Sequence, residues 1–176
     1  MEPPFELRLL SLQWMAGMPA EEDLCAHGQV AVRLGERVLS DAVNTWTVSA
    51  AALFLSRTLA ADHTAARPVG VQLLPCCGFT MWPDVTSENT LVLGCPNGAD
   101  WWVEHRGPQV LLTAPGGETV PLPFDAYRAQ VLAFADEVEA FYQRSAPKKM
   151  PTDADDATGY ALFWNEWHRR RNQWPR

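Results

Sequence analysis

The chain is expected to fold as an α+β protein in which an antiparallel β-meander sheet packs with about three helices, two of them C-terminal. Three observations predict this class. Short apolar runs recur about every ten residues between positions 69 and 124, with no helix-length segment between them. Turn residues such as Pro96-Asn97-Gly98 and Pro115-Gly116-Gly117 separate these runs. Helical periodicity is confined to one segment near residue 50 and to the C-terminal part of the chain.

Length and composition favour one domain over residues 1–176. Hydrophobic residues make up 47% of the chain, which is enough for a sizeable core. No stretch approaches the ~20 apolar residues of a membrane helix, and the N-terminus lacks the pattern of a secretory signal. We therefore expect a cytoplasmic protein with no membrane partner.

The N-terminal third predicts three short strands. Residues 5–11 alternate between apolar and polar side chains, as in a strand with one buried face. Residues 29–34 and 37–39 flank Gly35-Glu36, which is the pattern of a β-hairpin with a short turn.

The first helix is expected between residues 45 and 62, where the apolar spacing becomes helical and three consecutive alanines occur. Thr47 is the expected N-cap, and the helix is expected to end near His63, before Pro68.

Six further strands are expected before the C-terminal helices. Turn chemistry separates them, and the short spacing predicts antiparallel pairing. The candidate segments are residues 71–74, 79–82, 90–93, 101–105, 109–113 and 118–122.

Two helices joined by a linker near residues 147–156 are expected at the C-terminus. Residues 125–144 carry one apolar stripe, with Asp125 as the expected N-cap. The last helix is expected over residues 157–172, because Asp155-Asp156 precede it and complement the positive end of the helix dipole.

The last helix has an aromatic face that allows two interpretations. Docking on the sheet would bury this face and is the favoured interpretation, since a free helix would expose a large apolar patch. The alternative is a partner-binding surface that uses Trp164, Trp167 and Arg170, because Trp and Arg are preferred interface anchors. The aromatic residues of this region are Tyr160, Phe163, Trp164, Trp167 and Trp174.

The net charge of −7 argues against nucleic acid as a partner, because such proteins need a basic surface. The charge is uneven. Residues 1–147 carry 8 basic and 17 acidic side chains, and residues 148–176 carry 6 basic and 4 acidic ones. An acidic body suits a basic protein partner, although a solvated acidic surface explains the same composition.

A zinc site is one interpretation of the cysteines and histidines. Cys25, His27 and Cys76 are the candidate ligands, with His63 or His105 as further imidazoles. The spacing disfavours zinc, since there is no Cys-x-x-Cys and adjacent cysteines in a strand point to opposite faces. We expect reduced, metal-free cysteines, because free Cys is often buried and no export signal is seen.

Cysteine catalysis is a second interpretation. Cys95 lies in an expected turn, and Asp100 and His105 follow it closely in sequence. A nucleophile needs a base within hydrogen-bonding reach and a group that orients the base. Sequence proximity establishes none of this geometry, so a buried Cys95 beside a Pro-Asn-Gly turn is favoured.

No cofactor is expected. The chain has no Gly-x-Gly-x-x-Gly before a helix and no Gly-Lys-Ser/Thr, so the nucleotide-binding signatures are absent. Its acidic clusters lack the glycine turn and distal Glu of a calcium loop.

Three segments resemble those of bacterial immunity-type proteins of polymorphic toxin systems. They are Leu73-Leu74-Pro75-Cys76-Cys77-Gly78, the block from Cys95 to Trp101, and the block from Gly159 to Trp167 in a compact acidic α+β chain. The resemblance implies a protein-binding module that neutralises a toxin by binding it, without catalysis. Two alternatives stay open: a small cytosolic enzyme that uses Cys95 and His105, and an accessory protein with a non-toxin partner.

Overall fold

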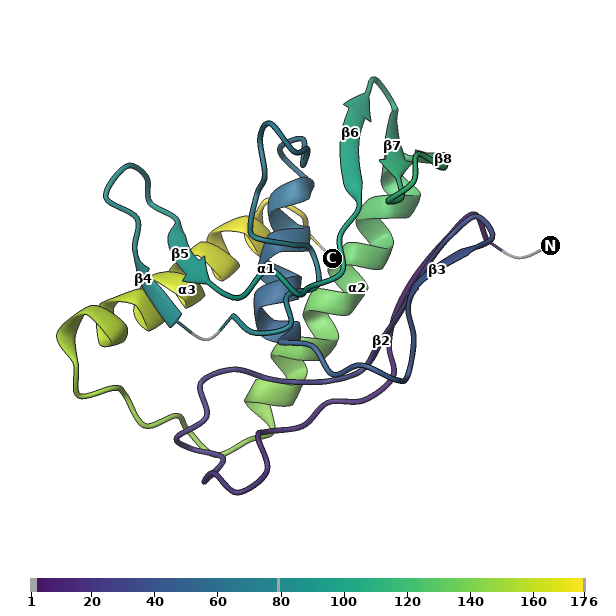
Figure 1. Ribbon diagram of the computed structural model, residues 1–176. Helices are drawn as coiled ribbons and strands as arrows, with labels where there is room; N and C mark the ends of the chain where they lie inside the picture. The colour runs from purple at the N-terminus through teal and green to yellow at the C-terminus, as the bar shows by residue number, and fades with distance from the viewer. Residues whose placement is uncertain (1–2, 79, 176) are drawn as a thin grey trace.

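The computed structural model describes residues 3–78 and 80–175 (Figure 1). The predicted α+β class is confirmed, with three helices of which two are C-terminal. The strands are β1 (Phe5–Leu9), β2 (Val30–Leu34), β3 (Arg37–Ser40), β4 (Thr80–Pro83), β5 (Thr90–Leu93), β6 (Trp102–Arg106), β7 (Gln109–Thr113) and β8 (Thr119–Pro123). The helices are α1 (Val48–Thr58), α2 (Phe124–Gln143) and α3 (Ala154–Asn172).

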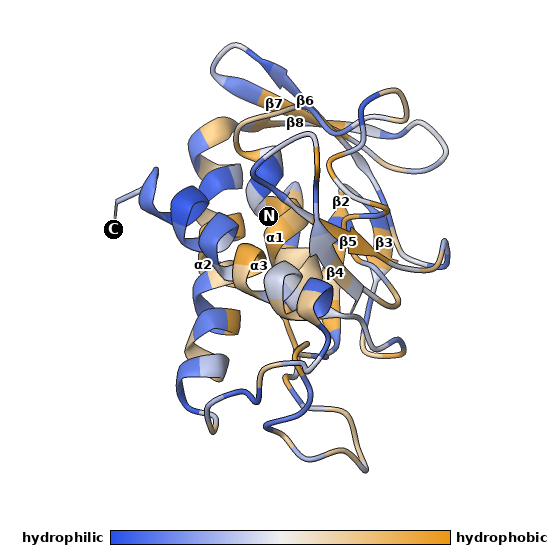
Figure 2. Ribbon diagram, turned by 90° about the vertical axis from the view of Figure 1, so that its left-hand side faces the viewer, coloured by the Kyte–Doolittle hydropathy of each residue, from blue (hydrophilic) through white to orange (hydrophobic). Residues whose placement is uncertain are grey.

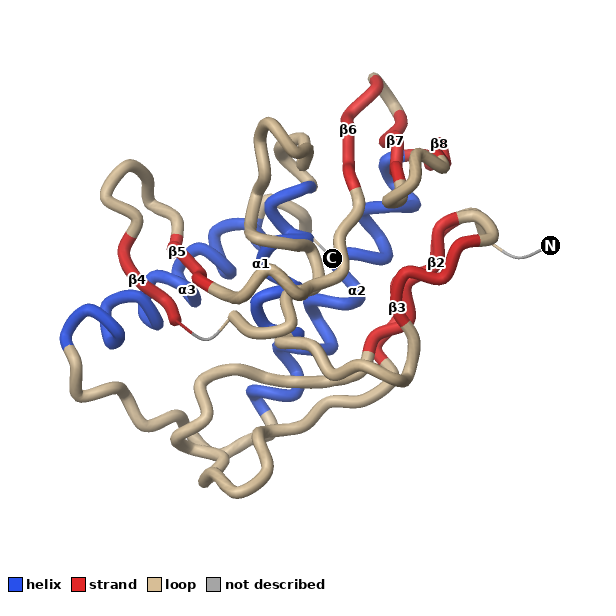
Figure 3. The backbone as a smooth tube through the Cα atoms, viewed as in Figure 1, coloured by secondary structure: helices blue, strands red, loops and turns tan. Residues whose placement is uncertain are grey.

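The strands of the described residues form three antiparallel sheets, β1–β2–β3, β4–β5 and β6–β7–β8. Figure 3 shows the helices in the middle of the molecule and the sheets around them. The β4–β5 hairpin packs on α3, whereas β6–β7–β8 lies at the first turns of α2 (Figure 1). Helices therefore separate the two C-terminal sheets.

The N-terminal sheet follows the predicted alternation. Phe5 pairs with Leu34 and Leu7 pairs with Val32, and all four side chains point into the core. The hairpin turn places Gly35 at a φ of +56°, a conformation that glycine adopts without a steric penalty. This sheet therefore covers one side of the helices.

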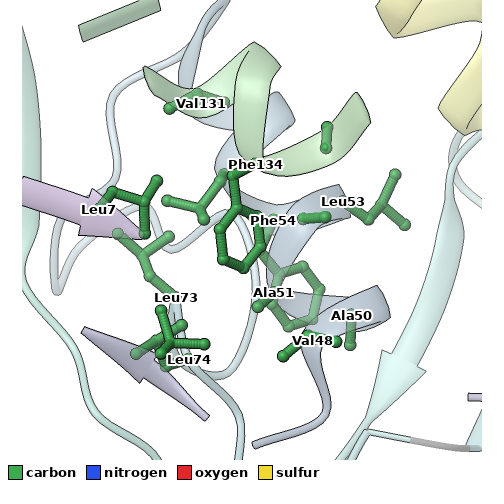
Figure 4. Packing of buried hydrophobic residues seen from close by; sticks show 14 of the residues in the cluster. Leu7, Val48, Ala50, Ala51, Leu53, Phe54, Leu73, Leu74, Val131 and Phe134 are labelled. Carbon is green, nitrogen blue, oxygen red and sulfur yellow. The ribbon is translucent and has the colours of Figure 1, made fainter. Parts of the chain in front are cut away.

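Helix α1 is the buried centre of the molecule (Figure 4). It begins after Thr47 as predicted, but the Thr47 hydroxyl donates to the Cys76 carbonyl instead of capping the helix. The predicted end near His63 is wrong, because the helix ends at Thr58. The backbone of His63 instead exchanges two hydrogen bonds with Val103, at 2.8 and 2.9 Å.

Helix α2 buries the predicted apolar stripe, but its predicted N-cap is wrong. Pro123 occupies the N-cap position, and Asp125 lies in the first turn, 3.0 Å from Arg128. Helix α3 begins three residues earlier than expected, because Asp153 accepts the backbone N–H groups of Asp155 and Asp156.

Helix α3 docks on the body of the protein as predicted, and Phe163 and Trp167 are buried. The predicted strand over residues 71–74 is wrong. Its Leu73 N–H donates to the Asp100 carboxylate, and only Leu74 forms a bridge, with Ala99. The first residue of the expected strand at 79–82 lies outside the described residues. No helix among the described residues is long and apolar enough to cross a membrane.

Candidate functional site

The outer face of the β4–β5 hairpin is apolar and exposed. Trp82 pairs with Leu91 across the hairpin, and both side chains are more than two-fifths exposed, at 44% and 43%. Leu93, two residues further along β5, is 38% exposed. In Figure 2 this hairpin faces the viewer, and β5 is coloured as hydrophobic.

Two more exposed apolar side chains lie near this hairpin in sequence or in space. Val85 lies in the turn of the hairpin and is 97% exposed, and Val71 comes from the loop before β4 and is 39% exposed. Val71, Leu91 and Leu93 line one groove of about 550 Å³. We call Trp82, Leu91, Leu93, Val71 and Val85 the hairpin patch.

The inner face of the same hairpin is buried. Met81 and Val92 pair with each other and are 3% and 4% exposed. Gly159 of α3 lies directly against this face, because a Cβ atom there would approach the Met81 carbonyl oxygen to 1.8 Å. This close contact of helix and strand requires glycine at position 159.

A buried ion cluster holds β5 to two helices. The Glu166 side chain on α3 is 0% exposed. Its carboxylate accepts from Arg57 Nε and Nη2 at 2.8 Å each, from Arg170 Nε at 2.7 Å and from the Thr90 N–H at 2.8 Å. Arg57 also donates to the carbonyl oxygens of Val69 and Thr90. The cluster therefore joins α1, α3, β5 and the loop before β4.

The electrostatics of this cluster favour an ionised Glu166. Burial alone would raise the pKa of its carboxyl. The hydrogen bonds and charge of Arg57, together with the bonds from Thr90 N–H and Arg170, outweigh burial, and the pKa is lowered. The guanidinium groups of Arg57 and Arg170 are thus engaged by an internal carboxylate, although both residues line the groove.

Carboxylates border the hairpin patch. The indole N–H of Trp82 donates to Asp156 of α3 at 3.0 Å, and Asp84 lines the groove beside the patch. Hydrogen bonds from the Ser87 hydroxyl and then from Thr86 lower the pKa of Asp84 to about 2, so this carboxylate is charged at neutral pH. Glu88 is exposed in the same turn.

The residues that the sequence suggested for cysteine catalysis each bond to a different partner in the structure. The Val69 N–H donates to His63 Nδ1, so His63 Nε2 carries the proton and donates to Asp100 at 3.0 Å. His105 Nε2 donates to the Thr58 carbonyl at 2.9 Å. Among the described residues, no hydrogen bond joins Cys95, His105 and Asp100 in a chain.

The candidate zinc ligands are also dispersed. Cys25 is buried and its thiol donates to the Gly78 carbonyl, and burial raises the pKa of this thiol to about 12. His27 lies 3.5 Å from Asp23, and Cys76 is exposed. Within residues 3–78 and 80–175, no three Cys, His, Asp or Glu side chains are arranged to hold a metal ion.

The C-terminal partner-binding candidates differ in exposure, and Trp164 lines a surface groove of about 390 Å³. Trp167 is 3% exposed, and Arg170 belongs to the Glu166 cluster. Trp164 is half-buried and packs edge-on against Tyr142, with ring centroids 4.8 Å apart.

Sequence interpretation missed Trp82, Leu91 and the Glu166 cluster. One signal for the cluster was present, since Glu166 lies on the same helix face as Phe163 and Arg170, three positions before and four after it. The signal for the hairpin patch was a strand that is apolar on both faces, Leu91-Val92-Leu93, which resembles a fully buried strand.

The comparisons with known proteins leave the structure as the basis for the functional argument. No protein-family model, curated protein or solved structure matches the chain.

Proposed function

We propose that this protein binds another protein through the hairpin patch, and that the partner is a basic domain. The observation that carries the proposal is the cluster of exposed apolar side chains on the outer face of β4–β5. Large exposed apolar patches on single chains mark interaction sites, because each such side chain gains free energy when a partner removes it from water. Trp82 has the size and polar edge of an interface anchor.

Charge complementarity supports a basic partner. Asp84, Glu88 and Asp156 border the patch, and the chain has a net charge of −7. A field of this sign speeds encounter with a basic protein and orients it before contact. The cations that line the groove, Arg57 and Arg170, are paired with Glu166 and oppose this field less than free cations would.

A rigid support favours binding by this hairpin. An isolated two-stranded sheet is marginally stable in water. Here Gly159 and the Glu166 cluster fasten the inner face to α3 and α1. The outer face therefore loses little conformational entropy when a partner docks.

The resemblance to immunity-type proteins suggests the identity of the partner, a toxin domain met in the cytoplasm. Under this proposal the protein acts by occupying the toxin surface, and no residue of the chain performs chemistry on it.

Site-specific photo-crosslinking tests this proposal in cells. A photoreactive amino acid replaces Leu91 in the hairpin patch or, as a matched control, the half-buried Leu111 on the outer face of β7. We expect one adduct from position 91 and none from position 111, with a partner domain whose isoelectric point exceeds ~9. Equal adducts from both positions, no adduct from position 91, or an acidic partner would contradict the proposal.

The captured domain then allows a functional test. We expect its expression to be toxic to cells and co-expression of this protein to restore growth. Association of the two purified proteins should slow as ionic strength rises past ~0.15 M, where the Debye length falls below ~8 Å. A captured protein that is harmless alone would contradict the immunity interpretation and leave the binding interpretation standing.

A further inference from the structure

Three cysteines meet at the open end of the β4–β5 hairpin. Cys76 and Cys77 precede β4, and Cys95 follows β5. The pairing of Thr80 with Leu93 brings the two flanking segments together. Their contact is close, since a Cβ atom at Gly94 would lie 2.1 Å from the Cys77 carbonyl oxygen.

A direct hydrogen bond joins the two segments at the cysteines. The Cys95 N–H donates to the Cys77 sulfur at 2.9 Å. Cys76 is exposed, and Cys77 and Cys95 are half-buried, so small oxidants reach them, whereas Cys25 is 0% exposed.

The local environment makes the cysteines unequal. The Asn97 backbone N–H, and after it the neighbouring thiols of Cys77 and Cys76, lower the pKa of Cys95. The neighbouring Cys95 thiol raises the pKa of Cys77 and of Cys76. Cys95 is therefore the first of the three to become a thiolate, the form that reacts with peroxides.

We propose that Cys95 and Cys77 form a peroxide-responsive dithiol that closes to a disulfide at the base of the hairpin. The Cys95 thiolate attacks one oxygen of hydrogen peroxide, the O–O bond breaks, and the sulfenic acid of Cys95 and one water form after uptake of a proton. The Cys77 thiol loses its proton, and its thiolate attacks the Cys95 sulfur. The S–O bond breaks, and the departing hydroxide takes up a proton to leave as the second water. In total the Cys77 and Cys95 thiols lose two electrons and two protons, and hydrogen peroxide takes up both to become two waters.

This inference is independent of the proposed function, because it concerns only the chemistry of the thiols. The sulfur of Cys77 is assigned as the resolving group since it already accepts the Cys95 N–H. Cys76 is the neighbouring thiol that the experiment must distinguish from it.

The test uses the full-length reduced protein and hydrogen peroxide as the probe. After brief oxidation and blocking of the remaining thiols with N-ethylmaleimide, we expect two of the four thiols to be lost. Without the blocking reagent, the intact mass should fall by about 2 Da, as for one disulfide. Peptide mapping should identify the link between Cys77 and Cys95, and the reaction should be faster than that of glutathione.

Matched variants identify the reacting group. Cys95→Ser should abolish the link, and Cys25→Ser, which changes a buried cysteine outside the cluster, should leave it intact. Cys76→Ser should also retain the link between Cys77 and Cys95. Four free thiols after oxidation of the wild type, a main link from Cys76 to Cys95, or a link only between molecules would overturn the proposal, and none of these outcomes depends on a variant folding.

Discussion

The two C-terminal sheets, β4–β5 and β6–β7–β8, are both antiparallel and both place one face against helices. Their outer faces differ. The outer face of β6–β7–β8 combines polar side chains such as Glu104 and Gln109 with the half-buried Trp102 and Leu111. None of the large, exposed apolar side chains in the described part of the chain comes from it. Trp82, Leu91 and Leu93 on β4–β5 all belong to that exposed class.

The difference shows which apolar residues the fold requires. Val110 and Leu112 bury the inner face of β7, and Met81 and Val92 bury the inner face of β4–β5. An antiparallel sheet needs only one apolar face to dock, so the second apolar face of β4–β5 is unexplained by folding. The proposed docking of a partner on this face accounts for it.

The largest expected effect on stability comes from a substitution that removes the ion cluster beneath the hairpin. Glu166→Ala should lower the free energy of unfolding by about 3–5 kcal/mol, because two buried guanidinium groups and the Thr90 N–H lose their acceptor. Asp136→Ala is the control, on α2, where Asp136 pairs with Arg171 of α3. It removes a more exposed, bidentate pair with Arg171 and should cost clearly less than Glu166→Ala, because Asp136 is about one-third exposed whereas Glu166 is fully buried. Urea denaturation of both variants measures the difference, and equal costs would show that the Glu166 cluster does not fasten the hairpin.

The same cluster should make stability depend on pH in a defined direction. The pKa of Glu166 is lower in the folded protein than its ordinary value of 4.5. Its contribution to stability is therefore fully present above pH 4.5 and is lost as the pH falls through the lower, folded pKa. As the pH is lowered from 4.5 through the folded pKa of Glu166, the denaturation midpoint of the wild type should therefore decrease. A Glu166→Gln variant should lack this component, and an identical pH profile for both proteins would contradict the assignment.

Oxidation of Cys77 and Cys95 to a disulfide should have the next largest effect on the free energy of unfolding. A disulfide between Cys77 and Cys95 closes a loop for which chain-entropy estimates give about 3 kcal/mol of stabilisation. Thermal unfolding of oxidised and reduced wild type should therefore differ, and the Cys95→Ser variant should show no response to peroxide. A disulfide that forms without raising stability would indicate that it distorts the hairpin.

The smallest expected effect is on the outer face itself. Leu91→Ser should change the free energy of unfolding by less than about 0.5 kcal/mol, as for surface substitutions. Val92→Ser, on the adjacent inward position, should cost about 2–4 kcal/mol, because it also buries a hydroxyl group. Similar losses from both would show that Leu91 is needed for folding and would weaken the comparison between the two sheets.

Strong local patterns predicted much of the fold. The apolar stripe of α2, the turn at Gly35-Glu36 and the strands at 90–93 and 109–113 needed only nearby residues, because each reflects a period or a turn that the chain itself encodes. The helix ends were less predictable. Backbone groups near them bond to distant partners, such as the pairing of His63 with Val103.

The division into three sheets and the candidate site depended on long-range contacts. Glu166 meets Arg57 across 109 positions of sequence, and Cys95 meets Cys77 across 18. Sequence spacing suggested Asp100 and His105 as partners of Cys95, but the fold gives Asp100 to His63. The exposure of Trp82 could not be predicted from the sequence either, because a strand that is apolar on both faces has the pattern of a fully buried strand.

One measurement tests the central claim most directly. With the domain captured by photo-crosslinking, the dissociation constant is compared for wild type, Trp82→Ala and Trp102→Ala, the last changing a tryptophan of β6 in the other sheet. We predict that Trp82→Ala weakens binding by at least about 30-fold, as for an anchor worth 2 kcal/mol, and that Trp102→Ala changes it by less than about 3-fold while both remain folded. Equal affinity for wild type and Trp82→Ala, or a larger loss from Trp102→Ala, would contradict the assignment of the hairpin patch as the binding surface.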